Sequence, residues 1–429
     1  MNWKNKIAVI CLLICILFTI SCVSATDSNI TDENSTFSQD IQIESEPLGA
    51  TGSEDTLSSS EVYFDASASS DGDGSYNNPY KYLRPDRISY GSTAVFREGT
   101  YEINYPMTFS SSGNEYVSLI GSGSDKTIFV SNIENDFSFI VDTDSTLYLQ
   151  DITLTNVHIN NHADLYARDV VFRDSVSFDE YYRPSLDYSY QRQYNSQVGG
   201  TIICDTPEGV KTRVKLMDCV FVNNNAKFGG AIALHHSWAY LENCIFYNSS
   251  ASQFGGAIYS RDSDLIIINS TFTKSNAKYG GTIYFKGSRN QLQIGNSSFD
   301  DSNSSSFGGA ISIENATSLI LNTTFTNYES EYDGGGAIYA MNTGLTVYLS
   351  SFYGGKSYYG GAICSLKTDL NLYSSKFRYN DVKYYGGSIY TSYGNIYICD
   401  STFSETHAKS SGGAICSRLP NSLKLESNT

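Results

Sequence analysis

Paired glycines recur along the chain and constrain its fold more than any other feature. They begin at positions 199, 229, 255, 280, 308, 335, 360, 386 and 412, a period of about 27 residues. A phenylalanine recurs with the same period at positions 221, 246, 272, 299, 325, 352, 377 and 403. Two markers with one shared period indicate a solenoid of stacked repeats rather than several globular domains.

Two aliphatic columns precede each phenylalanine. In the repeat of Phe272 they hold Leu265 and Ile267, and the position between the columns is often polar, as at Lys215 and Gln293. This period-2 alternation predicts a β-strand with one buried face. The same template extends upstream to Leu147 and Leu165 without the glycine pair, which gives ten copies of the unit.

A short polar residue usually stands three positions before the phenylalanine, as do Asp218, Asn243 and Asn269. Asn and Asp tolerate left-handed backbone, so we expect a corner there. Each glycine pair is followed by a small residue and then isoleucine, where a second strand begins. The glycines predict either positive φ or close stacking of backbone on backbone.

One repeat of about 26 residues buries too little apolar surface to offset its own chain entropy, so the repeats must stack on one another. Stacking in register predicts an all-β, right-handed, single-stranded parallel β-helix that rises about 4.8 Å per coil. A leucine-rich repeat horseshoe is the nearest rival. Its dense leucine consensus and its helix in each unit are not visible in this sequence.

The chain divides into four segments by composition. Residues 1–25 contain Lys4, Lys6, an apolar run and small residues, and predict a cleaved signal peptide; an uncleaved anchor and a lipid-modified Cys22 are the alternatives. Residues 26–60 are acidic and rich in Ser and Thr, and predict a solvated linker. Residues 61–146 would form an N-terminal cap with the first coils, and residues 147–429 the β-helix with a Tyr-rich insertion at 179–198.

The glycine pairs carry a family resemblance. The stretch 254–259, FGGAIY, resembles the GGA[ILV] motif of chlamydial polymorphic outer membrane proteins, and 221–224, FVNN, resembles their FxxN motif. The chain is still more similar to adhesin-like surface proteins of methanogenic archaea, over residues 62–429. The resemblance implies a right-handed, pectate-lyase-like β-helix at the cell surface. Thr282, Ser388, Tyr328 and Gly355 depart from the motifs.

Two clusters of side chains have the chemistry of a recognition surface. The long insertion is rich in Tyr and Arg, which suit contact surfaces, although it could equally be a flap packed on the solenoid. A Trp beside two His follows and could stack on a sugar ring or simply cap a corner. We predict no metal site there, because the sequence places no third ligand. The candidates are Tyr181, Tyr182, Arg183, Tyr188, Tyr190, Arg192, Tyr194, His235, His236 and Trp238.

Cysteines and sequons give two further predictions. Cys219 and Cys244 share a register in adjacent repeats, so a disulfide between them is geometrically allowed. Asn248, Asn303 and Asn315 lie in Asn-x-Ser/Thr sequons and are the preferred glycosylation candidates for a secreted chain. The aromatic residues beside the glycine pairs are interpreted mainly as stacking partners that stabilise the solenoid.

These features favour a secreted or cell-surface, adhesin-like protein that is not an enzyme. Its expected partners are glycans or proteins of host or neighbouring cells, with pairing of chains at an open C-terminal coil as a further option and no cofactor. The net charge of −17 argues against nucleic acid. The alternative is a polysaccharide lyase or glycoside hydrolase, because such enzymes often use this fold; a passive wall spacer is a third interpretation.

Overall fold

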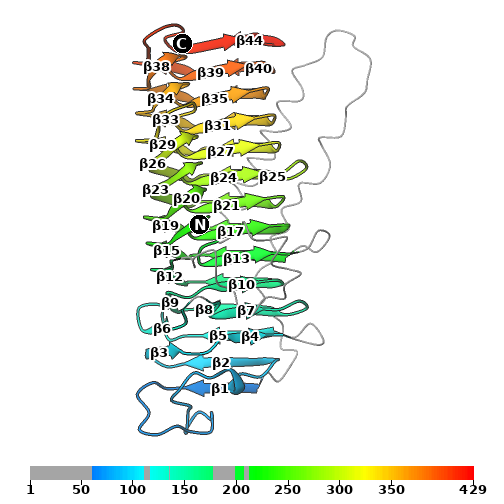
Figure 1. Cartoon of the computed structure of the whole chain (residues 1–429), viewed down its shortest axis with the longest axis vertical. Coiled ribbons are helices and arrows are strands. Elements are labelled where there is room, and N and C mark those ends of the chain that lie inside the picture. The colour runs from blue at the N-terminus through cyan, green and yellow to red at the C-terminus, as the bar shows by residue number, and fades with distance from the viewer. Residues whose placement is uncertain (1–59, 111–115, 135, 177–198, 207–211) are drawn as a thin grey trace, which may run out of the picture. The chain divides into compact units, whose positions relative to one another are not determined.

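The described residues form a parallel β-helix. The computed structural model describes residues 60–110, 116–134, 136–176, 199–206 and 212–429, and its coils stack from β1 (blue) to β44 (red) in Figure 1. All 44 strands pair in parallel, and one 3-10 turn, η1 (Pro85–Arg87), interrupts the first coils. The predicted right-handed parallel β-helix is confirmed. The predicted signal peptide, the whole Tyr-rich insertion and the acidic linker up to residue 59 lie outside the described residues.

Each coil contributes strands to three parallel sheets, which follow one another along the chain in the order first, third, second. The first sheet has 14 strands. They are β1 (Ser60–Phe64), β2 (Ser92–Phe96), β5 (Tyr116–Ile120), β8 (Thr146–Gln150), β11 (Asp164–Arg168), β14 (Thr212–Met217), β18 (Ser237–Glu242), β22 (Asp264–Ile268), β25 (Gln291–Gly295), β28 (Thr317–Leu321), β32 (Gly344–Tyr348), β36 (Asp369–Tyr373), β40 (Asn395–Cys399) and β44 (Ser422–Glu426).

The second sheet has 12 strands, most of which start at the isoleucine that follows a glycine pair. They are β4 (Met107–Phe109), β7 (Phe139–Val141), β10 (Ile159–Asn161), β13 (Ile202–Asp205), β17 (Ile232–His235), β21 (Ile258–Arg261), β24 (Ile283–Lys286), β27 (Ile311–Glu314), β31 (Ile338–Met341), β35 (Ile363–Leu366), β39 (Ile389–Ser392) and β43 (Ile415–Arg418).

The third sheet runs as two stacks of short strands, which the longer β23 and β26 join. Its strands are β3 (Gly99–Ile103), β6 (Thr127–Ser131), β9 (Thr153–Thr155), β12 (Val171–Arg173), β15 (Val220–Val222), β16 (Asn225–Phe228), β19 (Ile245–Tyr247), β20 (Ser250–Phe254), β23 (Thr271–Tyr279), β26 (Ser298–Phe307), β29 (Thr324–Thr326), β30 (Glu329–Ser330), β33 (Ser351–Tyr353), β34 (Lys356–Tyr359), β37 (Lys376–Arg378), β38 (Asp381–Tyr385), β41 (Thr402–Ser404) and β42 (His407–Ala408).

The recurring phenylalanines form one continuous file inside the solenoid. From Phe221 to Phe403, rings of successive coils stack nearly parallel with centroids 4.6–4.9 Å apart. The two aliphatic columns of the first sheet lie beside them, as Leu265 and Ile267 show with no exposed surface. The alternation in the sequence therefore marks the buried face, as predicted.

The predicted corners have left-handed backbone. The φ angle is +55° at Asp218, +55° at Asn243 and +53° at Asn269, and the same column keeps this conformation at Leu349, with φ +51°. Side-chain amides extend along the column, and Asn243 Nδ2 donates a hydrogen bond to Asp218 Oδ1 at 3.0 Å. Polar residues predominate there because they tolerate this backbone and can bond to the next coil.

The two glycines of each pair meet different requirements. In the pairs from Gly229 onward the first glycine has positive φ, such as +61° at Gly255. The second lies against the next coil, where a Cβ on Gly256 would be 2.1 Å from the carbonyl oxygen of Gly281. Both reasons for glycine that the sequence suggested therefore hold, one at each position.

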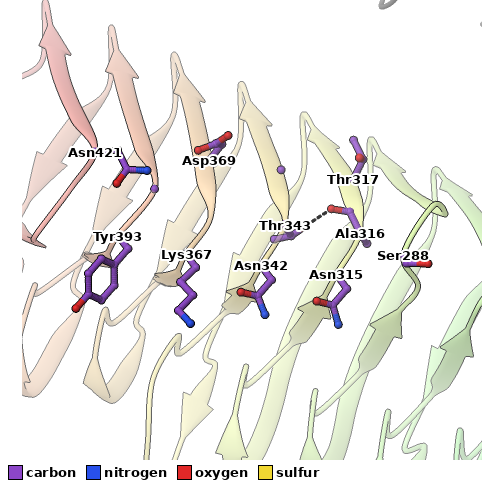
Figure 2. A pocket seen from close by; sticks show the side chains of 12 residues that line it. Ser288, Asn315, Ala316, Thr317, Asn342, Thr343, Lys367, Asp369, Tyr393 and Asn421 are labelled. Atoms are coloured by element: carbon purple, nitrogen blue, oxygen red, sulfur yellow. Dashed lines mark hydrogen bonds between the residues drawn. The ribbon is translucent and has the colours of Figure 1, made fainter.

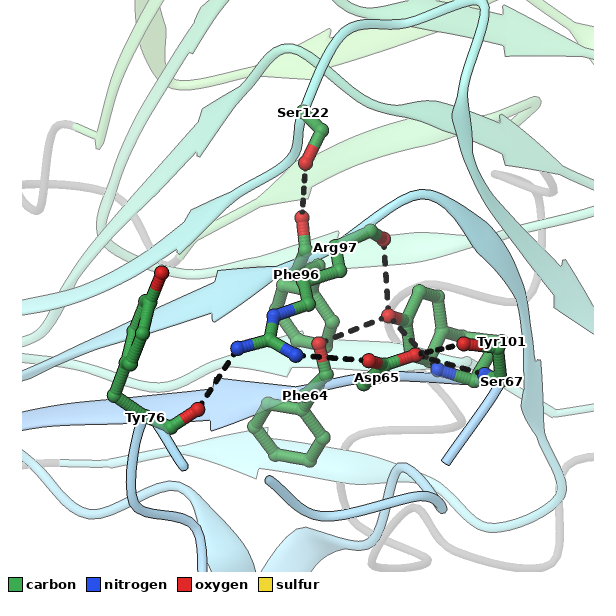
Figure 3. Close-up of polar contacts among 9 residues, drawn as sticks. Phe64, Asp65, Ser67, Tyr76, Phe96, Arg97, Tyr101 and Ser122 are labelled. Atoms are coloured by element: carbon green, nitrogen blue, oxygen red, sulfur yellow. Dashed lines mark hydrogen bonds and ion pairs between the residues drawn. The ribbon is translucent and has the colours of Figure 1, made fainter. Parts of the chain in front are cut away.

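A polar cluster ties the first coils together (Figure 3). The buried Tyr101 hydroxyl shares its one proton between two acceptors, the carbonyl oxygens of Phe64 (3.1 Å) and Arg97 (3.0 Å), and accepts from the backbone N–H of Ala66 at 3.2 Å. Arg97 pairs with Asp65 at 3.0 Å. Burial raises the pKa of Tyr101 to about 12, so the phenol stays protonated as a donor at neutral pH.

Aromatic rings outside the glycine turns form a second, smaller core. Phe228 and Phe254 stack at 5.6 Å, and Tyr259 and Tyr284 stack beside them at 5.8 Å. These rings pack on one another, in agreement with their interpretation as a stabilising column. No helix in the described part of the chain has the length and apolar character needed to cross a bilayer.

Candidate functional site: a groove along one corner

A groove runs along the corner where each strand of the second sheet turns into the next strand of the first sheet. It has a volume of about 730 Å³ and spans six successive coils (Figure 2). At about 4.8 Å per coil, the five steps between those coils cover about 24 Å. Its lining is Ser288, Asn315, Ala316, Thr317, Asn342, Thr343, Gly344, Lys367, Asp369, Tyr393, Gly394 and Asn421.

The first wall consists of one side chain from each corner. Asn315, Asn342, Lys367 and Tyr393 have φ angles of +54°, +52°, +50° and +59°. This left-handed backbone turns the chain sharply, and the four side chains project from the corner in a row in Figure 2. The wall therefore presents two amides, an ammonium group and a phenol at the spacing of the coils.

The residues after this row hold the corner in place. Thr343 is buried, and its hydroxyl donates to the carbonyl oxygen of Ala316 in the preceding coil. Thr368 is likewise buried and donates to the carbonyl oxygen of Ala340 at 3.1 Å. These bonds join neighbouring coils beneath the groove, so its floor is part of the solenoid framework.

The second wall is the start of the first-sheet strands. Thr317, Gly344 and Asp369 occupy one register there. A Cβ on Gly344 would have no atom within 4 Å, so this coil leaves open space where its neighbours carry side chains. The glycine widens the groove at its middle.

Asp369 is the carboxylate of the lining and is held in place. Its Oδ1 accepts hydrogen bonds from the backbone N–H and from Nδ2 of Asn395, both at 2.9 Å. Lys367 lies on the same coil two residues earlier, and the Tyr393 side chain is 47% exposed one coil further on. The groove thus combines donors and acceptors for hydroxyl groups with one aromatic face.

Most of the predicted recognition residues lie outside the described residues, namely Tyr181, Tyr182, Arg183, Tyr188, Tyr190, Arg192 and Tyr194. Of the other three, the structure keeps the two histidines together and places Trp238 apart from them. His235 and His236 lie at the corner, before the groove begins, and their rings stack at 3.9 Å. Trp238 lies on the outer face of the first sheet, where its ring stacks with that of Tyr240 at 6.1 Å.

The disulfide predicted between Cys219 and Cys244 stays a prediction. Cys219 and Cys244 are buried free thiols in adjacent coils, and the in-register placement is as predicted. Cys219 Sγ bonds to the carbonyl oxygen of Met217 at 3.3 Å and Cys244 Sγ to that of Glu242 at 3.4 Å. The two thiols also interact directly with one another. Burial raises the pKa of the Cys219 thiol.

The three preferred sequons lie in different settings. Asn248 is exposed and its Nδ2 donates to Asn223 Oδ1 at 2.8 Å, while Asn303 is half-buried and donates to Asp301 Oδ1 at 3.0 Å. Asn315 lines the groove. Glycosylation at these positions remains a prediction.

Sequence reasoning missed the groove and one partner of the histidines. The available signal was a third column, four residues after each isoleucine that follows a glycine pair, which contains His236, Asp262, Asn315, Asn342, Lys367 and Tyr393. Asp262 lies one coil beyond His236 in this column, and its Oδ2 is 4.0 Å from Nε2 of His235. The stacking of coils therefore brings a carboxylate, that of Asp262, to the two histidines, where the sequence had shown no third potential metal ligand.

Neither a family model nor a curated protein matches this chain. Solved structures do match, at low similarity. The A-module of the mannuronan C-5 epimerase AlgE6 of Azotobacter vinelandii is 11% identical, covers 79% of this chain and 90% of that one, and has a TM-score of 0.36. The GH136 lacto-N-biosidase of Eubacterium ramulus is 10% identical over 86% of this chain and 67% of that one, with a TM-score of 0.40.

A mannuronic acid-specific polysaccharide family 6 lyase from the human gut microbiota is 11% identical over 78% of this chain and 77% of that one, with a TM-score of 0.30. The expectation that the chain is not an enzyme is corrected here, because an epimerase, a lyase and a lacto-N-biosidase are among the proteins it matches. At these identities and TM-scores the matches assign no activity to this chain, and its parallel β-helix fold is established by its own strand pairing.

Proposed function

We propose that this protein recognises an extended glycan, which lies along the corner groove. The observation that carries the proposal is the row of Asn315, Asn342, Lys367 and Tyr393 on successive coils, opposite the fixed carboxylate of Asp369. One polar or aromatic group per coil, repeated about every 4.8 Å, suits a polymer of sugar units better than a compact ligand. Amides and hydroxyls would bond to sugar hydroxyls, and Tyr393 would stack on a ring.

The setting that we propose for this recognition is the cell surface. The leader-like residues 1–25 and the resemblance to adhesin-like proteins of methanogenic archaea support an exported protein that binds glycans of neighbouring or host cells. The groove contains one ammonium and one carboxylate, so its own charges balance even though the chain is acidic.

A glycan array with the purified full chain tests the proposal, followed by affinity measurements on the glycans retained. Tyr393→Ala should weaken binding about tenfold, the effect of losing one stacked ring. Tyr379→Ala is the matched control, because Tyr379 is 51% exposed and has the same φ of +59° in a different corner. Equal affinity of the wild type and Tyr393→Ala for every retained glycan would remove the groove as the binding site.

A second candidate is a lyase or epimerase acting in the same groove. The fixed carboxylate of Asp369 favours it, since one base can remove the proton next to the carboxylate of a uronate sugar, whereas hydrolysis ordinarily uses two carboxyl groups. Lys367 would pair with the uronate carboxylate. Incubation of uronans with the protein, read as ultraviolet absorbance of unsaturated ends or as changed sugar configuration, tests this. Activity that Asp369→Asn leaves unchanged would exclude Asp369 as the base.

A further inference from the structure

We propose that His235, His236 and Asp262 form a binding site for a divalent transition-metal ion of the Zn²⁺ type. Each residue offers one ligand atom, and these atoms lie within 4.8 Å of one another. Imidazole nitrogen and carboxylate oxygen are ordinary ligands of Zn²⁺. The site lies on the same corner as the groove, in the two coils before Ser288, and it does not depend on glycan binding.

In-register stacking produces this cluster. His235 ends β17 and pairs with Arg261, which ends β21 one coil further on. His236 and Asp262 are the corner residues that follow, with φ angles of +51° and +50°. Because both corners have the same left-handed backbone, an imidazole and a carboxylate occupy equivalent positions in neighbouring coils.

A second contact fixes the tautomer of His236. Nδ1 of His236 lies 2.9 Å from the carbonyl oxygen of Thr206, in the preceding coil. A carbonyl oxygen only accepts, so Nδ1 carries the proton and the neutral ring has its lone pair on Nε2. Metal-binding histidines typically donate their other ring N–H to a carbonyl or carboxylate in this way. His236 is therefore held in the tautomer that binds a cation.

The surroundings leave the cluster both held and accessible. The His235 side chain is 10% exposed and stacks on His236, whereas the Asp262 side chain is 38% exposed. Bonds from Zn²⁺ to nitrogen or oxygen are about 2.0–2.2 Å long. His235 Nε2 and Asp262 Oδ2 are 4.0 Å apart, so rotation of the exposed Asp262 side chain brings both within reach of one ion.

One cation already lies beside the carboxylate. Arg261 Nε is 3.4 Å from Asp262 Oδ2. A carboxylate has two oxygens and about four lone-pair sites, so a guanidinium group and a metal ion can share it. Three protein ligands leave the fourth tetrahedral position of a zinc ion to water or to a ligand group, as at sites that are not purely structural.

Titration of the tag-free full chain with Zn²⁺ by calorimetry tests the site. We expect one ion per chain, and we expect His236→Asn and Asp262→Asn each to weaken binding at least about tenfold. Asn favours left-handed backbone, so both variants keep the corner conformation. His407→Asn, at an exposed histidine in another coil, is the control and should leave the affinity unchanged.

Two further measurements accompany the titration: the visible absorption of bound Co²⁺ and the thermal unfolding midpoint with and without Zn²⁺. Co²⁺ should give visible absorption bands with the wild type that Asp262→Asn loses. Zn²⁺ should raise the unfolding midpoint of the wild type, because it binds the folded chain, and should not raise that of Asp262→Asn. Failure of the wild type to bind Zn²⁺, or equal Zn²⁺ affinity in the wild type and both corner variants, would overturn the proposal.

Discussion

The Tyr328 hydroxyl donates a hydrogen bond to Oδ1 of Asn380 at 2.8 Å, across two coils. Both side chains are buried. Gly355 lies in the coil between them, where an added Cβ would be 2.3 Å from Tyr328 Cε2 and 2.7 Å from Asn380 Oδ1. The same Asn380 oxygen accepts the Gly355 N–H at 3.0 Å, so the tyrosine fills the space that the glycine leaves.

This arrangement predicts that adding a methyl group at Gly355 destabilises the fold more than removing the hydroxyl of Tyr328. Tyr328→Phe should lower the free energy of unfolding by about 1–2 kcal/mol, the cost of one buried hydrogen bond. Gly355→Ala should cost more, because the backbone and the Tyr328 ring must both shift. Gly344→Ala, with no atom near the new Cβ, is the control. Thermal or urea unfolding that gives the two alanine variants the same stability would contradict the prediction.

The sequence predicted the stacking of coils but not the contact between Tyr328 and Gly355. The Phe and Ile columns repeat in every coil, so their periodicity alone identified the strands and the buried face. Tyr328 and Gly355 looked like two separate departures from FxxN. They compensate one another only when residues 27 positions apart are placed side by side, and no single repeat contains that information.

At Leu349 we predict that a substitution can increase the stability of the fold. It has φ +51° and is 45% exposed, in a column that otherwise holds Asn, Asp or Ser. Left-handed backbone costs a β-carbon residue about 1–2 kcal/mol, less for Asn. Leu349→Asn should therefore raise the unfolding midpoint, and it could extend the amide ladder in which Asn322 Nδ2 donates to Asn296 Oδ1 at 2.8 Å. The reverse change, Asn322→Leu, should lower the midpoint; a rise there would contradict this account.

The candidate site was less predictable than the fold, for a physical reason. Sequence reasoning selected residues by type, such as Trp238 and the tyrosines of the insertion. The groove instead arises from a corner column of mixed composition and from the absent side chain of Gly344. A groove is a property of several coils together, and the third member of the histidine cluster, Asp262, likewise comes from the next coil.

Gly344 offers a test of the groove that leaves the core intact. Gly344→Gln would place a side chain in the open middle of the groove and should abolish the binding of glycans that the wild type retains. Its unfolding midpoint should stay unchanged, because nothing lies within 4 Å of the new Cβ. Gly295→Gln is the matched control, since Gly295 has equally open surroundings on the same sheet but does not line the groove. Glycan affinity that survives Gly344→Gln would show that the ligand binds elsewhere.

Stability should also fall in mild acid because of His158. This side chain is buried, its Nδ1 lies 3.3 Å from the carbonyl oxygen of Gly200, and burial lowers its pKa to about 4. An unfolded histidine titrates near 6.5. Between about pH 6.5 and pH 4 the unfolded chain therefore binds more protons than the folded chain, so acid favours unfolding. The loss should be complete near pH 4 and amount to about 3 kcal/mol.

Replacing the residue as His158→Gln keeps a donor for the Gly200 carbonyl but removes the titration, so the variant should lose less stability over this range. Parallel pH profiles for the variant and the wild type would show instead that other groups cause the acid sensitivity.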